Sequence, residues 1–400
     1  MMFVITIEII KCILVFWFDN YRDLDYSSYH EQVKIFLEGE RNYFELRGIQ
    51  GPWHYPILHL YTYTLIYWMT DDVYNPYPAI ILATVTHLVV AYLAVRIYQE
   101  AFGKNSRNVL LVTICCLGTT TTANATKFAF WDSLNVMFIY LCIYMLQKGY
   151  SYLGFTFFYI ALAYKLNVLL YLPGIMFIVS LNKGVWVSIL CFLLWIVCHF
   201  ILALQFTIHN YQTYFTRAFS FAKKFSLTGS IGHIWIGRHE RHRFQEPWFA
   251  LLFVLALFLN LLYVLIVRWA PLLHPERKFG FTIFLDSIGL IPCRKQSKIG
   301  KISPYFVAEV MFLSNLIGIV WARTVHRQFM IWYWFSIPFL AYSSIINNKI
   351  SLSTVVMSMI MLNGSYIINI NQLDSIVTFS MNLFYLVLNV FGSTPGTISK

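Results

Sequence analysis

The chain opens with the apolar run MMFVITIEIIKCILVFWF, residues 1–18, and passes at once into the polar run DNYRDLD, residues 19–25. A run of this length is close to the ~20 apolar residues that an α-helix needs to cross a bilayer. Lys11 stands within the run and no small-residue cleavage site follows it. We therefore expect a retained first span and not a cleaved leader, with the acidic pair Asp23 and Asp25 just outside the membrane.

The composition of the whole chain is that of a membrane protein. Apolar residues make up 58% of the chain and charged residues 12%, against about 25% charged residues in soluble proteins. We predict an all-α polytopic membrane protein with about 12 transmembrane helices in a single domain, residues 1–400. The predicted spans are 1–18, 77–98, 108–123, 132–147, 151–164, 167–181, 185–205, 248–267, 304–321, 329–346, 350–368 and 374–391.

The basic residues of the loops predict the orientation. The stretch 268–303 is dense in Lys and Arg, so the positive-inside rule places it in the cytosol together with the N-terminus. A shorter apolar run, 55–69, is rich in Tyr and Thr, and a helix in the membrane interface suits it better than a span. Counting it as a span would move the basic loop to the opposite side. The stretches 19–76 and 206–247 are then expected to be luminal loops.

Three charged residues lie inside or at the edge of apolar runs, namely Asp132, Lys165 and Arg323. A charge at such a position is costly, so each of them is a candidate for a functional site. The alternative for Asp132 and Lys165 is an ion pair between helices. The predicted threading brings all three to the same membrane face, which favours a shared site.

The triplet Asp23-Leu24-Asp25 allows three interpretations. A D-x-D triplet can hold Mg²⁺ or Mn²⁺ against a sugar phosphate, one of the two carboxylates can act alone as a general base, or both can be solvated acids of a loop. The chain has seven cysteines, and their spacing is not typical of a disulfide framework or a zinc site. We therefore predict no metal and no cofactor, with a metal ion at the triplet kept as an alternative.

Five stretches carry a resemblance to a known family. They are YRDLDYSSY (21–29), GPWHYP (51–56), FWD (130–132), KLNVLLYLPG (165–174) and LSNLIGIVWARTVHRQFMIWY (313–333). Together they resemble the dolichyl-phosphate-mannose-dependent α-1,3-mannosyltransferases of the endoplasmic reticulum, in order and over about residues 19 to 345. The last stretch is the most specific, because it resembles the family pattern S-N-x-I-G-I…R-x-x-H-x-Q-F-x-x-W-Y.

The chain departs from the family pattern at several positions. Trp131 stands where the family usually has Asn, and Arg327 where it usually has Tyr. An acidic position before Gly51 is replaced around Ile49 and Gln50. The family's Trp-rich luminal signature is matched only loosely here, at 233–235 and 243–244. These departures affect the expected contacts with the acceptor and leave Asp25 in place.

The resemblance implies a fold and a reaction. The fold is of the GT-C type, with a catalytic first luminal loop that contains interfacial helices. The reaction moves mannose, with inversion at C1, from dolichyl-phosphate-mannose to a dolichyl-diphosphate-linked five-mannose oligosaccharide on the luminal side of the endoplasmic reticulum membrane. The implied partners are these two lipid-linked sugars and membrane lipid, without nucleic acid.

The same resemblance suggests roles for particular residues. Asp25 is expected to be the catalytic base, with Asp23 supporting it. The donor phosphate is expected to meet Arg323, His326, Lys165, Arg217 and Gln328. Contacts with sugar or lipid are expected from Trp53, His54, Tyr55, Asp132 and Asn167, although a belt of interfacial aromatic residues is an equal alternative for the first three.

Three other functions remain open from the sequence. A related mannosyltransferase could act on another glycolipid, a flippase could move a lipid-linked sugar, and a non-catalytic subunit could retain the fold. Transporters often show internal repeats and charges near the membrane midplane, whereas here no repeat is evident and the charges gather at one face.

Overall fold

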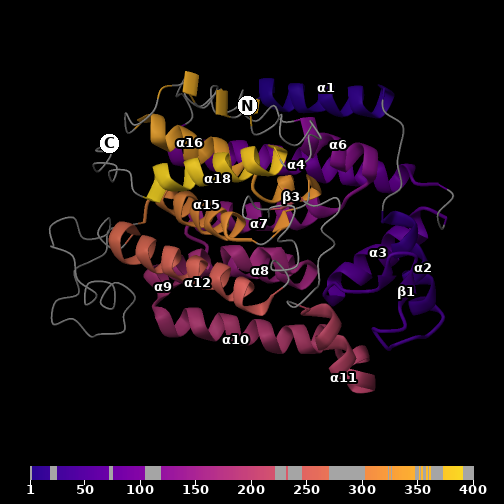
Figure 1. Ribbon diagram of the computed structural model, residues 1–400. Coiled ribbons are helices and arrows are strands. Elements are labelled where there is room, and N and C mark those ends of the chain that lie inside the picture. Colours follow the sequence, from indigo (N-terminus) through magenta and orange to yellow (C-terminus); the bar gives the residue numbers. More distant parts are fainter. Residues whose placement is uncertain are drawn as a thin grey trace.

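The computed structural model is mostly helical. It describes residues 2–18, 25–71, 75–103, 119–220, 231–232, 246–269, 302–322, 324–325, 327–346, 351, 353–354, 357–358, 360–361 and 373–390. Figure 1 shows the long helices side by side, with α2, α3 and β1 gathered at one end of the bundle. The helices of the first half are α1 (Met2–Phe18), α2 (Tyr26–Leu37), α3 (Ile57–Met69), α4 (Tyr77–Phe102), α6 (Thr119–Phe128), α7 (Asp132–Gln147), α8 (Ser151–Tyr164), η1 (Leu166–Tyr171), α9 (Leu172–Lys183) and α10 (Val185–Leu202).

The second half is also helical. Its helices are α11 (Leu204–Ala218), α12 (Pro247–Tyr263), η3 (Val264–Trp269), α15 (Pro304–Val320), η4 (Arg327–Trp332), α16 (Ser336–Ile346) and α18 (Leu373–Val390). A short hairpin and a short antiparallel pair of strands far apart in the sequence complete the described part. One pairs β1 (Arg47–Gly48) with β2 (Gly51–Pro52), and the other pairs β3 (Ile231–Gly232) with β4 (Thr324–Val325).

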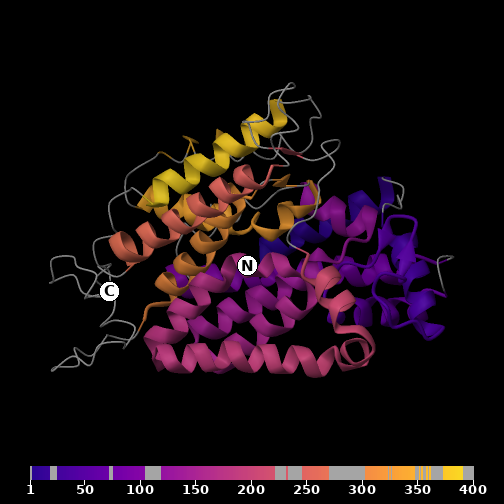
Figure 2. The same ribbon diagram turned by 60° about the horizontal axis from the view of Figure 1, so that its bottom comes forward.

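The centre of the bundle is α15. Every residue from Phe306 to Val320 is buried, and the helix packs against α4, α7, α9, η1, α16 and α18. Around it, α7 packs against both α4 and α8. Figure 2 shows α10 and α18 on opposite sides of this bundle.

In the described part of the chain, four helical stretches are long and apolar enough to cross a membrane, namely Tyr77–Phe102, Leu166–Lys183, Val185–Leu202 and Pro247–Trp269. In the last two, only 11% of the most apolar window is buried inside the protein. Exposed apolar surface on this scale is foreign to a protein that is surrounded by water, whereas hydrocarbon accepts it. The predicted spans 132–147 and 151–164 coincide with α7 and α8.

The predicted span 329–346 is not one continuous helix. A 3₁₀ helix, η4, comes first, a turn follows at 333–335, and α16 begins at Ser336. Pro338 explains the restart, because proline lacks the backbone N–H that a helix interior needs and is tolerated in the first turn. Of the predicted span 350–368, only six helical residues lie within the described part, and most of 108–123 lies outside it.

The segment 206–247, predicted as a luminal loop, begins with the helix α11, which runs on to Ala218. Phe206, Tyr214 and Ala218 are its buried residues, and a kink at Asn210 separates Phe206 from the other two. They join a second hydrophobic cluster that also contains Tyr43 and Trp53 from the segment before α3. This cluster, separate from the core around α15, fixes the 25–71 segment to the end of the bundle.

Candidate active site

Asp25 stands immediately before α2 and is half-buried. Its backbone carbonyl accepts a hydrogen bond from the Tyr29 amide at 3.1 Å, the first bond of the helix. Burial raises the pKa of Tyr29 well above its ordinary value, and the negative charge of Asp25 adds to the shift. The same carboxylate also contributes to the raised pKa of Tyr55, which is due chiefly to burial. Asp25 therefore shares an electrostatic environment with both phenols.

The β1–β2 hairpin delivers the motif Trp53-His54-Tyr55 beside α2. Gly51 has φ +103°, a backbone conformation that favours glycine, and its carbonyl accepts a hydrogen bond from Gln32 of α2 at 2.7 Å. The Tyr29 hydroxyl donates to the Tyr55 hydroxyl at 3.2 Å.

Aromatic and histidine rings extend from the hairpin to α3. The Tyr55 ring stacks on His59 of α3 with centroids 4.1 Å apart. The rings of Trp53 and His54 lie 6.2 and 4.3 Å from that of Tyr55. The hairpin thus builds an aromatic wall next to Asp25.

A buried ion pair adjoins this wall. Lys165 stands between α8 and η1, and its Nζ lies 2.5 Å from Oδ1 of Asp132, the first residue of α7. The ammonium also lies 5.2 Å from the ring centroids of Tyr55, Phe329 and Trp332. One carboxylate and three aromatic faces therefore surround a single cation.

The electrostatics of Lys165 tie the ion pair to Asp25. Burial alone would lower the pKa of this lysine, but the charge of Asp132, together with Tyr55 and the more distant Asp25, outweighs it and raises the pKa. The lysine is therefore charged at neutral pH. The structure thus brings Asp25, Tyr55, Lys165 and Asp132 into one site.

Several buried polar atoms around Lys165 have no hydrogen-bond partner among the described residues. They are Nε1 of Trp53, Trp131 and Trp332, Oδ2 of Asp132 and Oδ1 of Asn167. Buried polar groups in native proteins are nearly always paired. Within the described part of the chain, buried polar atoms without a partner also occur away from Lys165, for example in Trp195 and Trp269, so these five atoms alone do not identify a ligand.

Arg217 of α11 contacts the hairpin and not the ion pair. Its guanidinium donates to the carbonyls of Trp53 at 3.4 Å and Pro52 at 3.2 Å. Burial lowers the pKa of Arg217, and the nearby Arg47 adds to the effect. The arginine therefore secures the aromatic wall, and its predicted contact with phosphate remains a prediction.

Some predicted site residues cannot be placed. Asp23, Arg323 and His326 lie outside the described residues, as does the side chain of Gln328. The segment that carries them nevertheless reaches the site, since Phe329 and Trp332 of η4 flank Lys165. Within the described part of the chain, no three His, Cys, Asp or Glu side chains gather as a metal site would require.

Sequence reasoning did not assign roles to Tyr29, His59, Phe329 or Trp332. A usable signal existed for Phe329 and Trp332, which are three residues apart within the last family stretch. Side chains at this spacing eclipse each other on a 3₁₀ helix, and these rings stack with centroids 3.8 Å apart and planes at 13°. For Tyr29 and His59 the contact arises only from the folded hairpin.

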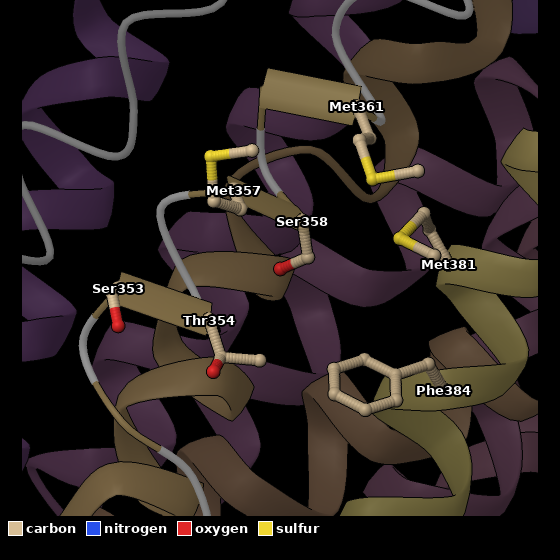
Figure 3. A pocket seen from close by; sticks show the side chains of 7 residues that line it. All are labelled: Ser353, Thr354, Met357, Ser358, Met361, Met381 and Phe384. Atoms are coloured by element: carbon tan, nitrogen blue, oxygen red, sulfur yellow. The ribbon is translucent and has the colours of Figure 1, made fainter.

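A cavity of about 430 Å³ lies elsewhere, beside α18. Figure 3 shows its lining, which consists of Ser353, Thr354, Met357, Ser358, Met361, Met381 and Phe384. None of these side chains is ionisable at neutral pH, so this cavity offers no base. The cluster around Asp25 and Lys165 does contain ionisable groups and is therefore the candidate for the chemistry.

Comparisons with known proteins identify the relatives of this chain. An α-1,3-mannosyltransferase of Cryptococcus neoformans, named Dol-P-Man:Man(5)GlcNAc(2)-PP-Dol alpha-1,3-mannosyltransferase, is 28% identical over 354 residues, covering 84% of this chain and 76% of that protein. The human protein of the same name is 24% identical over 333 residues, with 82% and 73% covered. A probable enzyme of this name from Dictyostelium discoideum is 25% identical over 356 residues, with 81% and 76% covered.

Among solved structures, ArnT from Cupriavidus metallidurans bound to undecaprenyl phosphate aligns with 97% of this chain and 76% of its own, at a TM-score of 0.43 and 12% identity. A family model described as ALG3 protein matches residues 2–367. The resemblance seen in the five sequence stretches is thereby confirmed, as is the prediction of a mannosyltransferase. Since the match extends over most of its length, this chain belongs to the ALG3 protein family.

Proposed function

We propose that this protein transfers mannose from dolichyl-phosphate-mannose to a dolichyl-diphosphate-linked five-mannose oligosaccharide, forming an α-1,3 linkage. Membership of the family supports the reaction class. The observation that carries the assignment of the site is the grouping of Asp25 with the buried cation Lys165 and an aromatic wall. A base, a cation and ring faces are the groups that transfer from a lipid phosphate sugar needs.

Asp25 serves as the base. It takes the proton of the acceptor 3-hydroxyl while that oxygen attacks C1 of the donor mannose. The bond between C1 and the phosphate oxygen breaks, and its electron pair leaves with dolichyl phosphate. One displacement converts the β donor into an α product, so the sugar inverts without a covalent intermediate on the enzyme. Asp23 is proposed to support Asp25.

Lys165 stabilises the negative charge of the leaving phosphate. An ammonium has three N–H donors, and Asp132 takes one of them. The remaining donors and the charge are available to the oxygen that gains electrons as the bond breaks. A fixed cation that acts mainly at this stage stabilises the transition state more than the bound substrate. Arg323, His326, Arg217 and Gln328 are proposed as further phosphate contacts.

The sugar lies between the aromatic wall and the unpaired polar atoms. His54 and Tyr55 offer partly exposed rings, whereas Trp53 is fully buried behind them and supports the wall. Asp132 and Asn167 each offer a buried oxygen without a protein partner among the described residues. Sugar hydroxyls would satisfy these oxygens. Because the leaving group is a monophosphate on a lipid, fixed cations suffice and the proposal uses no metal.

The finer architecture is proposed as well. About 12 helices cross the endoplasmic reticulum membrane in a GT-C type fold, and the 19–76 segment forms the catalytic luminal loop. The basic 268–303 loop in the cytosol supports this orientation through the positive-inside rule. The gathering of α2, α3 and β1 at one end of the bundle (Figure 1) is consistent with a site at one membrane face.

Purified full-length protein with radiolabelled dolichyl-phosphate-mannose and the five-mannose lipid acceptor tests the function. The expected product is one mannose longer and loses the label to an α-1,3-specific mannosidase. EDTA is expected to leave the rate unchanged. A rate lost in EDTA and restored by Mn²⁺ would contradict the metal-free mechanism and favour the D-x-D chelate, and transfer only to a different glycolipid would contradict the acceptor.

A further inference from the structure

The first span is attached to the bundle by a narrow face. In the described part of α1, only Glu8 and Cys12 are buried. The large apolar side chains of this helix point outward, with Trp17 and Phe18 about four-fifths exposed. In Figure 1, α1 lies at the edge of the bundle near α6, and its packing partners are α6 and α4. Apolar packing therefore contributes little to holding this helix.

The carboxylate of Glu8 joins three helices. Oε1 lies 2.6 Å from Nζ of Lys11 on the same helix. Oε2 lies 3.2 Å from Nε2 of His87 on α4 and accepts a hydrogen bond from the hydroxyl of Thr122 on α6 at 3.3 Å. Glu8 and His87 are wholly buried. An ionisable group inside a span is costly and marks a function, and hydrogen bonds between polar side chains hold helices together in a bilayer.

This junction lies beside the half of the site that holds Asp132, and α1 precedes Asp25 in the sequence. The helix α1 ends at Phe18, seven residues before Asp25. Next to His87, the Thr86 hydroxyl lies 2.9 Å from the hydroxyl of Ser133, and Ser133 follows Asp132 at the start of α7. One carboxylate thus fixes α1 against α4 and α6, and α4 in turn contacts the start of α7, where Asp132 stands.

We propose that Glu8 is a positioning residue, which locks α1 to α4 and α6 and so keeps the start of α7, with the Asp132–Lys165 pair, in its working position. The predicted effect on catalysis rests on the proposed function. The predicted effect on the attachment of α1 rests only on the geometry of that helix. A misplacement of about 1 Å between reacting groups can lower a rate by about 100-fold. Loss of the junction should therefore act on kcat more than on substrate binding.

The test compares Glu8→Leu and Glu8→Leu/Lys11→Leu with wild type in the full-length protein. The double variant avoids leaving a lone ammonium in the bilayer, so it serves where the single variant does not fold. We expect kcat to fall about 10–100-fold in correctly folded protein, with KM for the donor changed less than about threefold. Glu38→Leu, an exposed carboxylate at the end of α2, is the control and should keep the wild-type kcat.

A cross-link separates positioning from a general loss of structure. The rings of Phe16 on α1 and Tyr77 on α4 lie 6.2 Å apart, so Phe16→Cys and Tyr77→Cys can be joined by a short bis-maleimide. Its rate of formation needs no substrate, and we expect it to fall at least about tenfold when Glu8 is Leu. Once formed, the cross-link should restore kcat to within about threefold of wild type.

Unchanged kcat and cross-linking in folded Glu8→Leu would overturn the inference, as would a kcat that the cross-link fails to restore. The two proposals fail in different ways. A wild-type protein that does not use the mannosyl donor contradicts the proposed function, whereas the cross-linking rate still decides whether Glu8 fixes α1.

Discussion

Lys165 shows how a buried charge can be both stable and useful. Taking an ammonium out of water is expensive unless a partner compensates for it, and here Asp132 lies at 2.5 Å with three ring faces around it. The second oxygen of Asp132 has no partner among the described residues. The buried pair Arg268–Glu309 also leaves one carboxylate oxygen without a partner among the described residues. The three ring faces and the nearby Asp25 charge are what distinguish Lys165.

Replacing Lys165 by Met should lower kcat by about 10²–10³, because a fixed cation at the leaving phosphate is worth about as much as one oxyanion donor. The measurement is steady-state transfer with purified protein. Lys34→Met, on the exposed side of α2, is the control. If Lys165→Met does not fold, Lys165→Met/Asp132→Asn removes both charges and should show the same loss. A folded double variant with the wild-type kcat would exclude a catalytic role for the lysine.

His59 predicts a dependence of stability on pH. Burial, with smaller effects from Lys165 and His54, lowers the pKa of His59 well below its ordinary value of 6.5. Below pH 6.5 the unfolded chain takes up a proton at this residue that the folded chain refuses. The neutral residue thus stabilises the fold above that pH, and the stabilisation is lost as pH falls toward the folded pKa.

Thermal melting in detergent should therefore show Tm falling between pH 7 and pH 5. His59→Gln should flatten this slope, whose limit for one proton is about 1.4 kcal/mol per pH unit. His209→Gln, an exposed histidine on α11, is the matched control and should keep the slope. An equal slope in wild type and His59→Gln would contradict the assignment.

The sequence could identify the charged members of the site but not their contacts. Asp132 and Lys165 were visible because a charge at the edge of an apolar run is unusual, and Asp25 because it follows the first span. The ring faces around Lys165 come from segments more than 100 residues apart along the chain. Such proximity depends on helix packing, which leaves no periodic trace in the sequence.

The short 3₁₀ helix η4 places two aromatic residues at the cation. Its three-residue turn brings Phe329 directly over Trp332, so the stacked pair presents its rings to Lys165 as one surface. An α-helix would set the same two side chains about 60° apart around its axis. The break before α16 is thus part of how the site is built.

Replacing Trp332 by Leu removes one ring of this stack and one face of the cation. We expect a loss of about 1–2 kcal/mol in stability and a lower kcat, measured by thermal melting and by transfer. The matched control is Trp186→Leu, at a tryptophan on α10 that is 70% exposed. This control should change stability and kcat much less than Trp332→Leu does. Equal effects in the two variants would contradict the role of the stack.

Helix positions were predictable where an apolar run had clear limits. The bounds of α7 and α8 match the predicted spans because charged or small polar residues border both runs. The restart at Ser336 and the helix α11 were missed. Hydropathy averages over a window, so it does not register a local 3₁₀ turn or an amphipathic helix of mixed composition.

Two hydrophobic clusters divide the molecule into a bundle and a cap. The core around α15 holds the spans, while the aromatic cluster of Tyr43, Trp53, Phe206 and Tyr214 holds the 25–71 segment at one end. The proposed site lies where the two meet, since Lys165 and Asp132 come from the bundle and Tyr55 from the cap. Composition predicted the bundle, but the cap was expected only as a loop with interfacial helices.

The proposed orientation predicts which side of the membrane each segment faces. The first variant keeps Cys293 as its single cysteine and is studied in sealed endoplasmic reticulum vesicles. An impermeant maleimide added outside should label this protein, because 268–303 is proposed to be cytosolic. A single cysteine at exposed position 49, Ile49→Cys, should react only after permeabilisation. The reverse pattern would contradict the luminal site.

The most direct measurement is transfer of mannose by Asp25→Asn. The substitution keeps the size of the side chain and removes its ability to accept a proton at neutral pH. General base catalysis speeds a reaction by about 10²–10⁴-fold. The kcat of Asp25→Asn should therefore fall at least about 100-fold, while the protein keeps its wild-type elution profile and Tm. Glu38→Gln, at an exposed carboxylate after the same helix, should keep full activity. A folded Asp25→Asn protein that transfers mannose at the wild-type rate would contradict the account.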